Sequence, residues 1–443
     1  MNTPTTTPLP TPPTSRAAQL RPVLLGAALG VPVSLAAFAF SVAAAKLGTW
    51  LWETLPEHAG HDEIPRWWPF IVLPVAGLLV GLVVKSMPGH GGHLPADGMG
   101  VAPTDPSHVP GVVLAALVSL AAAAVVGPEG PLLAIGSGIG VLANRRMGTS
   151  QDPTTLLVVS IAAQTAAVAA IFGSPVVALV LVVEMVALTG VVPLSAALLP
   201  AMASGGTAAL MFSGLGRIDG VSMGGLAVGD IAGATRPDLA DLLWCLPLAA
   251  VVAAVVAQIR PIGKRIAPRV TANVVPMSVA AGALIAAAAV LYSVVTDRTL
   301  YEVLSSGHEL LGEVITEPAS FATGSLVALV VLKAVAYVLS MTAFRGGLIF
   351  PALLIGAAAG VVLGHLPGLG TLPGIAIAMT AATVVSCSLP ITSVVLVALI
   401  LGASFEGMAP LILVSAVIAM IVSRIVPTLA APANAPANAP ANA

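Results

Sequence analysis

The sequence has very little charge. Only 8% of its 443 residues are Asp, Glu, Lys or Arg, whereas 58% are hydrophobic. Soluble globular domains carry about a quarter charged residues, so this shortage excludes an ordinary water-soluble domain and indicates an integral membrane protein. The net charge is −2 and no long basic run is present, so we expect no nucleic-acid partner. The expected location is the plasma membrane, which the chain crosses several times.

Cysteine is also scarce. The two cysteines, Cys245 and Cys387, both lie in apolar runs, which argues against a disulfide framework and against a thiolate metal site. His90 and His93 have a spacing that suits a metal ion, but two ligands are few for a closed site, and a polar loop is the simpler interpretation. We expect neither a metal nor a cofactor.

Apolar runs follow one another closely, and several are shorter than the roughly 20 residues that a perpendicular membrane crossing needs. Short segments interrupted by Gly and Pro are typical of broken helices that meet near the middle of a membrane around a substrate. The sequence predicts an all-α polytopic membrane protein with broken, tilted helices. We expect helices near 23–47, 69–86, 109–126, 130–146, 154–171, 175–190, 192–214, 238–260, 271–294, 320–343, 348–365, 371–387, 390–403 and 408–426.

The two ends of the chain differ from this apolar middle. Residues 1–22 are rich in Thr and Pro, and residues 427–443 repeat Ala, Pro and Asn. Such compositions cannot bury enough apolar surface to fold, so we expect both ends to be disordered. One transmembrane domain over residues 23–426 remains between them.

Two stretches of this domain recur. Residues 131–140 resemble residues 351–360, and residues 174–183 resemble residues 389–398, at offsets of 220 and 215 residues. Two matches in the same order at nearly the same offset predict duplicated halves, about 23–215 and 238–426. The letters do not show whether the repeats are inverted, although we expect inversion, and an ion site where the halves meet is the usual consequence.

Basic residues predict the orientation of the chain. They gather in two loops, at Arg145–Arg146 and at Arg260, Lys264, Arg265 and Arg269. The positive-inside rule places these loops and both termini in the cytoplasm.

One carboxylate, Glu129, stands between two glycines and two prolines inside the apolar stretch Val125–Gly140. A charge at membrane depth is costly and marks a functional site by default. Pro131 has the fixed φ of a first helical turn, so Glu129 and Gly130 lie at a helix start, where unpaired N–H groups and the helix dipole attract an anion. Glu129 is then either a gate that competes with a permeating anion and leaves when protonated, or a dipole partner at the membrane surface.

These motifs resemble those of the CLC chloride channels and chloride/proton exchangers, over about residues 20–426. Gly127–Pro131 matches the family motif G-(K/R)-E-G-P, with Pro128 in place of the basic residue. Gly346–Pro351 is similar to the G-x-F-x-P region, and Gly91–Pro95 falls where the family carries G-S-G-I-P.

The resemblance implies passage of chloride and similar monovalent anions as substrates, with Glu129 as the gate. It also implies a homodimer in a lipid bilayer, with one pathway in each subunit. Each glycine-rich helix start lets backbone N–H groups approach an ion without an intervening Cβ. The anion-binding positions expected from the motifs are Gly92, His93, Gly130, Leu348 and Ile349.

Three departures from the family pattern concern the pore. Gly92 stands where the family has a serine, and beyond Val426 there is no last helix with the family's tyrosine. Met185 occupies the position of the exchangers' inner proton-transfer glutamate, with Glu184 just before it. Adjacent helical residues point about 100° apart, so Glu184 does not simply replace that glutamate. Glu184 is either part of a proton path or a structural residue with its own partners.

The departures favour channel-like or loosely proton-coupled movement. A strict chloride/proton antiporter is the alternative, and a non-transporting membrane scaffold is a second one.

Three further polar residues have competing interpretations. Lys333 lies inside an apolar run, where a cation needs a partner. It either adds positive potential for anions or pairs with an acid to fix helices, and we expect the structural pair. Arg345 either attracts anions at a vestibule or extends its charge to water. Ser137 suggests an intramembrane protease in isolation, but a nucleophilic serine needs a base, and the second half offers only His308 and His365. We therefore expect no enzyme activity.

Overall fold

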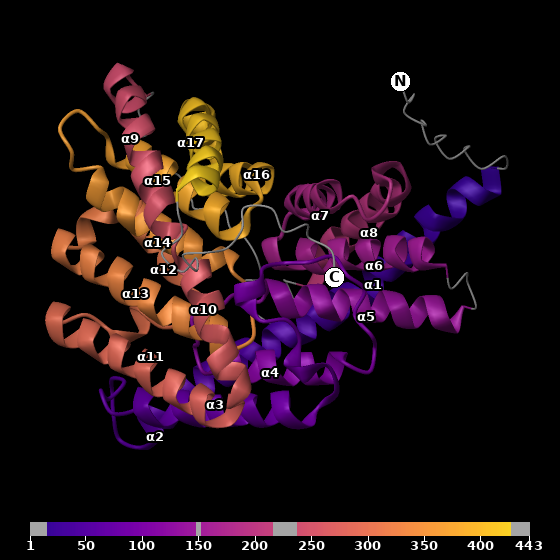
Figure 1. Cartoon of the computed structure of the whole chain (residues 1–443), viewed down its shortest axis with the longest axis horizontal. Helices are drawn as coiled ribbons and strands as arrows, with labels where there is room; N and C mark the ends of the chain where they lie inside the picture. Colours follow the sequence, from indigo (N-terminus) through magenta and orange to yellow (C-terminus); the bar gives the residue numbers. More distant parts are fainter. Residues whose placement is uncertain (1–15, 148–151, 216–236, 427–443) are drawn as a thin grey trace, which may run out of the picture.

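The computed structural model describes residues 16–147, 152–215 and 237–426, and these residues are almost entirely helical (Figure 1). Within them there is no strand, and an isolated backbone bridge joins Gly127 to Gly347. In the described ranges, 8 helical segments are long and apolar enough to cross a membrane. The predicted class, an all-α polytopic membrane protein, is therefore confirmed.

The first half of the chain runs from α1 to α8. Its elements are α1 (Arg16–Thr49), the π-helical turn η1 (Trp50–Thr54), α2 (Leu55–His58), α3 (Pro69–Ser86), the 3₁₀ turns η2 (Pro88–Gly91) and η3 (Pro95–Asp97), α4 (Val109–Ala121), α5 (Glu129–Arg146), α6 (Pro153–Phe172), α7 (Pro175–Thr189) and α8 (Leu194–Leu215).

The second half runs from α9 to α17. Its elements are α9 (Leu239–Val256), α10 (Ile259–Ala272), α11 (Val274–Thr296), η4 (Leu300–Glu302), α12 (His308–Thr316), η5 (Pro318–Ser320), α13 (Thr323–Ala343), α14 (Ile349–Leu363), α15 (Thr371–Cys387), α16 (Pro390–Leu401), η6 (Gly402–Ser404) and α17 (Phe405–Ile425).

Local sequence explains several of these helix starts. Asp152 and Ser174 lie just before α6 and α7, and their side chains accept hydrogen bonds from the N–H groups of Thr155 and Val177. These caps satisfy donors that have no partner inside the helix. Proline at the first position of α6, α7 and α16 suits the same place, because its missing N–H would be unpaired there anyway.

Helices of the two halves pack in the same pattern. In the first half α5 packs on α6, α6 on α8, and α1 on α8; in the second, α14 packs on α15, α15 on α17, and α9 on α17. Figure 1 shows the two halves side by side, the first in indigo to magenta and the second in red to yellow. This correspondence favours the duplication that the recurring motifs predict.

The glycines of the recurring motif explain why it recurs. A Cβ on Gly136 would come within 2.7 Å of the Ala163 carbonyl oxygen on α6, and one on Gly356 within 2.6 Å of the Met379 Cα on α15. Small residues at such positions let two membrane helices approach closely. The motif therefore fixes the α5–α6 and α14–α15 packing.

The start of the first helix differs from the sequence expectation. The first helix begins at Arg16 and not after residue 22, because the residues following Arg16 are strong helix formers. The expected disorder of residues 1–15 and 427–443 lies outside the described residues.

The basic stretch expected as a loop is helix α10. Ile259, Gly263, Ala267 and Val270 are buried at helical spacing, while its basic side chains lie on other faces. This amphipathic pattern has few apolar residues, so an apolar-run criterion misses it.

Candidate functional site

Two helix starts, one from each half, meet inside the protein. Gly127 lies just before α5 and Gly347 just before α14. The Gly127 N–H donates to the Gly347 carbonyl at 3.0 Å, and the Gly347 N–H donates to the Gly127 carbonyl at 2.5 Å. This pair of bonds joins the two glycine-rich segments, so the positive ends of both helices lie close together.

The side chain of Glu129 crosses from one helix start to the other. It is completely buried, and its Oε1 accepts a hydrogen bond from the Phe350 N–H, in the first turn of α14, at 3.3 Å. The Ile349 N–H also faces the carboxylate. The carboxylate therefore occupies the place at the α14 N-terminus that suits an anion.

The second carboxylate oxygen, Oε2, accepts no hydrogen bond from the described residues. A Cβ on Gly127 or on Gly347 would overlap this oxygen, so both positions require glycine while the carboxylate lies here. The backbones of Gly127 and Gly347 thus pack closely around the Glu129 carboxylate, but few hydrogen bonds hold it.

A cavity of about 470 Å³ reaches the paired helix starts. Its wall includes Gly130 at the start of α5, Gly346 and Leu348 before α14, and Asp105 in the segment between η3 and α4. Asp105 pairs with Arg145, near the end of α5, at 2.7 Å. The Ser107 and Arg145 hydrogen bonds hold the pKa of Asp105 well below its ordinary value, so it stays ionised. The cavity therefore extends from the helix starts toward the basic end of α5.

The structure brings most of the predicted anion-binding positions together. Gly92, His93, Gly130 and Leu348 line this cavity. Ile349 is fully buried and does not line it; its N–H faces Glu129. The motif identifies this helix start but cannot show which of its N–H groups faces the cavity.

Glu184 has a full set of partners on the other half of the molecule. Its carboxylate accepts hydrogen bonds from the Ile391 N–H at 2.8 Å, the Thr392 N–H at 2.7 Å and the Thr392 hydroxyl at 2.6 Å. These donors belong to the first turn of α16, so Glu184 caps that helix and fastens α7 to it. The contacts favour the structural interpretation of Glu184 over a proton path.

Lys333 is also held structurally, but not by an acid as expected. Its Nζ donates to the backbone carbonyls of Glu302, Val303 and Leu304 at 2.9–3.1 Å and to that of Ser305 at 3.4 Å. These carbonyls belong to a loop about 30 residues away in the sequence, a contact that sequence spacing cannot reveal. The cation thereby satisfies carbonyls that would otherwise be buried without donors.

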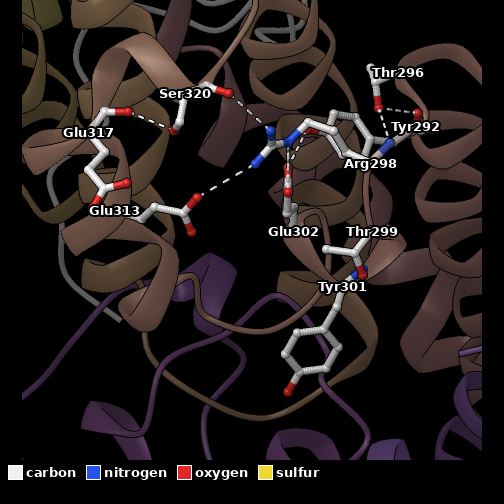
Figure 2. A network of polar contacts seen from close by, with 9 residues as sticks. All are labelled: Tyr292, Thr296, Arg298, Thr299, Tyr301, Glu302, Glu313, Glu317 and Ser320. Atoms are coloured by element: carbon white, nitrogen blue, oxygen red, sulfur yellow. Dashed lines mark hydrogen bonds and ion pairs between the residues drawn. The ribbon is translucent and has the colours of Figure 1, made fainter. Parts of the chain in front are cut away.

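Side chains also hold the same loop in place (Figure 2). Arg298 donates to Glu302 at 2.8 Å and lies 3.7 Å from Glu313, and the Tyr292 hydroxyl also donates to Glu302. The Ser305 N–H in turn donates at 2.7 Å to the Ala123 carbonyl, in the connection that leads to Glu129. The loop therefore braces the segment that carries the buried carboxylate.

The last candidates from the sequence are the nucleophile Ser137 and a metal site. Ser137 accepts a hydrogen bond from the Thr104 N–H and exchanges one with Ser160, both at 2.7 Å, so the bonds of its hydroxyl are with a backbone amide and a second hydroxyl. Within the described ranges no group of three His, Cys, Asp or Glu side chains is placed to hold a metal ion.

Sequence reasoning missed one residue at this site. The hydroxyl of Tyr337, on α13, is fully buried and donates to the Leu348 carbonyl at 2.8 Å. A tyrosine inside an apolar run is a usable signal, because its hydroxyl needs a partner when buried. The family resemblance places the pore tyrosine in a last helix, so Tyr337 on α13 was not among the predicted site residues.

Paired helix starts around a buried carboxylate, in an all-helical membrane protein, define an ion-transport type of fold. Residues 96–424 match the family described as "Voltage gated chloride channel", which is well over half of the chain. The chain therefore belongs to the CLC family, whose members are anion transporters, and the resemblance stated from the motifs is confirmed.

Similar proteins agree with this assignment. The "Putative ion-transport protein YfeO" of Escherichia fergusonii is 28% identical over 377 residues, covering 82% of this chain and 81% of its own length. The protein of the same name from Escherichia coli is 28% identical over the same extents.

Solved structures share the fold at lower identity. A CLC-type fluoride/proton antiporter matches with a TM-score of 0.69 at 16% identity, over 94% of this chain and 98% of its own. A slow cyanobacterial Cl⁻/H⁺ antiporter matches with a TM-score of 0.66 at 16% identity, over 91% and 94%. A eukaryotic CLC transporter matches with a TM-score of 0.66 at 18% identity, over 93% and 73%.

Proposed function

We propose that this protein moves chloride and similar small monovalent anions across the plasma membrane, with Glu129 as a protonatable gate. One observation carries the proposal: the Glu129 carboxylate occupies the N-terminus of α14, next to the cavity, with one oxygen that has no hydrogen-bond partner among the described residues. A group in that position competes directly with an anion for the same N–H donors.

The cavity provides the approach. An anion that enters it meets the backbone around Gly130 and Leu348, at the positive ends of α5 and α14. While Glu129 is ionised, its charge opposes the anion and its side chain fills the place beyond. Protonation removes the charge and weakens the hold of the Phe350 N–H, because hydrogen bonds to ionised groups are the stronger ones. The side chain can then leave and the anion can pass.

The direction of the cavity follows from the basic end of α5. Because the positive-inside rule places Arg145 and Arg146 in the cytoplasm, we propose that the cavity is the cytoplasmic approach to Glu129.

Loose coupling to protons is the form of the proposal that fits the residues best. Met185 stands where exchangers carry their inner glutamate, and the Glu184 carboxylate is occupied by three donors of α16. Two proteins of the same fold are described as proton antiporters, so strict antiport is the competing mechanism. Proton movement driven by a chloride gradient in proteoliposomes separates the two.

The homodimer belongs to the proposal through the family resemblance. Chemical cross-linking of the protein in native membranes, followed by denaturing electrophoresis, tests it: a dimer band is expected, and a monomer band alone contradicts it.

The gate is tested with Glu129→Gln in anion-loaded liposomes. Wild-type anion efflux is expected to rise as pH falls, because protonation releases the carboxylate. The variant keeps the side-chain shape without the charge, so its efflux at neutral pH should match that of the wild type at acidic pH and should not vary with pH.

Asp105→Asn is the matched control, because Asp105 is an exposed carboxylate on the same cavity and should leave the pH response intact. A full pH response in Glu129→Gln contradicts the gate. Absence of efflux from the wild-type protein contradicts transport itself and favours the scaffold.

A further inference from the structure

Arg345 lies in the short segment between α13 and α14, beside the paired helix starts. Its backbone N–H donates to the Ser119 hydroxyl at 3.1 Å, and its residue surface is only 5% exposed. An arginine that extends its charge to water keeps its guanidinium exposed, so this arginine does not do so. It is a cation retained inside the protein.

Two cavities share this residue. Arg345 lines the cavity that reaches the helix starts, and also a second cavity of about 690 Å³ between the end of α3 and the α10–α11 junction. The second cavity contains Lys85, Asn273 and one acid, Asp97. Gly92, His93 and Leu94 also line both cavities, so an ion that enters either one reaches the neighbourhood of the same guanidinium.

The guanidinium has more donors than acceptors. Arginine carries five N–H groups. Nη1 donates to the Phe344 carbonyl at 3.3 Å and Nη2 to the His90 carbonyl at 3.4 Å, both long bonds, and Nε has no acceptor among the described residues. None of the three ion pairs in the described ranges includes Arg345.

Such a charge is costly to keep without a partner. A buried cation needs an opposite charge or a full set of hydrogen bonds to offset the loss of hydration. Among the described residues Arg345 makes no ion pair and only two long hydrogen bonds, although it lines two cavities. Asp97, on the wall of the second cavity, makes no ion pair with it. A small anion in the cavity would supply both the opposite charge and the missing acceptors.

The neighbouring loop is shaped for a close approach. Gly91 and Gly92 have φ values of 70° and 85°, a backbone region that favours glycine. A Cβ on Gly91 would be in ordinary contact with the Nε of Arg345 at 3.4 Å and in tight contact with the Ala115 Cβ at 3.2 Å, so the loop backbone lies close to the guanidinium. The loop has no side-chain hydroxyl at Gly92, and the arginine lies against that same loop.

We propose that Arg345 is an anion-binding residue of this pathway, and that its free N–H groups bind the anion that reaches the shared wall of the two cavities. The proposal rests on the anion transport proposed above and names the side chain that binds the anion. The planar arrangement of donors on a guanidinium matches two oxygens of one anion, so the residue accepts nitrate in addition to halides.

The test compares Arg345→Gln, Arg345→Lys and wild type, each checked for folding by its thermal unfolding in detergent. Initial rates of bromide and of nitrate transport into proteoliposomes, at increasing anion concentration, give a half-saturation concentration for each anion. Arg345→Gln is expected to raise both values by about tenfold or more, because the variant loses the charge and the charge-assisted hydrogen bonds to the anion; tenfold corresponds to about 1.4 kcal/mol. Arg345→Lys keeps the positive charge but loses the planar pair of N–H donors. Its half-saturation concentration should therefore lie closer to the wild-type value for bromide than for nitrate.

Arg145→Gln is the matched control, since it removes one positive charge near the same cavity without contacting the proposed site. It should change both half-saturation values less than twofold. A folded Arg345→Gln with wild-type half-saturation overturns the proposal. If that variant does not fold, an unchanged nitrate-to-bromide ratio in Arg345→Lys overturns it.

The outcomes separate this proposal from the one it rests on. A wild-type protein that does not transport either anion contradicts both. Transport that depends on Glu129 but not on Arg345 contradicts only the assignment of Arg345.

Discussion

Two buried carboxylates of the first half contact helix N-termini of the second half, and they differ in how well they are satisfied. Glu184 accepts three hydrogen bonds of 2.6–2.8 Å from the start of α16. Glu129 accepts one of 3.3 Å from the start of α14, and its second oxygen has no partner among the described residues. The same kind of contact can therefore fasten two helices or leave a side chain ready to exchange with an ion.

The two buried cations differ in the same way. Lys333 donates to four loop carbonyls, whereas Arg345 donates to two carbonyls at 3.3 and 3.4 Å. Each poorly satisfied charge lies at or beside the cavity, and each well satisfied charge holds structure. Incomplete satisfaction thus separates the two charges that we propose to act on the anion, Glu129 and Arg345, from the two that hold structure.

The largest expected effect on stability comes from Lys333→Met. The substitution keeps most of the side-chain volume but leaves three buried carbonyls and one partly buried carbonyl without this donor. We expect a loss of about 3 kcal/mol in the free energy of unfolding. Thermal unfolding in detergent, followed by tryptophan fluorescence, measures it.

The matched variant for Lys333→Met is Arg345→Met, which removes the other buried cation. It should lose much less stability, because its two hydrogen bonds are long. Equal losses in the two variants would break the comparison between the cations.

A smaller effect is expected from Glu184→Gln. The amide keeps one acceptor oxygen, but its NH₂ group then faces a donor at the start of α16. We expect a loss of about 2 kcal/mol in unfolding free energy, with the pH response of anion efflux retained. Thermal unfolding and liposome efflux are measured on the same preparation.

Glu129→Gln is the matched variant for Glu184→Gln and should show the opposite pair of results: little loss of stability and no pH response. Loss of the pH response in Glu184→Gln would return that residue to the proton path.

The sequence was informative where a residue's role depends on its neighbours in the chain. Most helix positions follow from apolar runs, α10 and α12 excepted, and the start of α5 at Glu129 follows from Pro131 and the flanking glycines. The meeting of the two helix starts follows less directly, from the recurring motifs together with the family resemblance.

The sequence was silent where a role depends on contacts from distant segments. Lys333 is held by carbonyls about 30 residues away, and Glu184 by α16, more than 200 residues away. The alternatives for Arg345 stayed open because its exposure depends on how the Gly89–Gly92 loop packs against it. Pairings between distant segments are tertiary facts, which neither period nor spacing encodes.

The smallest expected effect concerns Tyr337→Phe, and it sharpens where the anion is bound. The Tyr337 hydroxyl donates to the Leu348 carbonyl at the cavity wall. Its removal takes this hydrogen-bond donor away from the buried carbonyl. We expect a loss of about 1 kcal/mol in unfolding free energy. The half-saturation concentration for bromide should rise less than about threefold. The dipole of one unpaired carbonyl repels an anion only weakly, whereas removal of the Arg345 charge takes away a full attractive charge.

Tyr301→Phe is the control, since the Tyr301 hydroxyl makes no hydrogen bond with the described residues and its ring packs on Trp52. If Tyr337→Phe raised half-saturation as much as Arg345→Gln, the main contact with the anion would lie at the Leu348 backbone, and the guanidinium would serve the segment's structure instead.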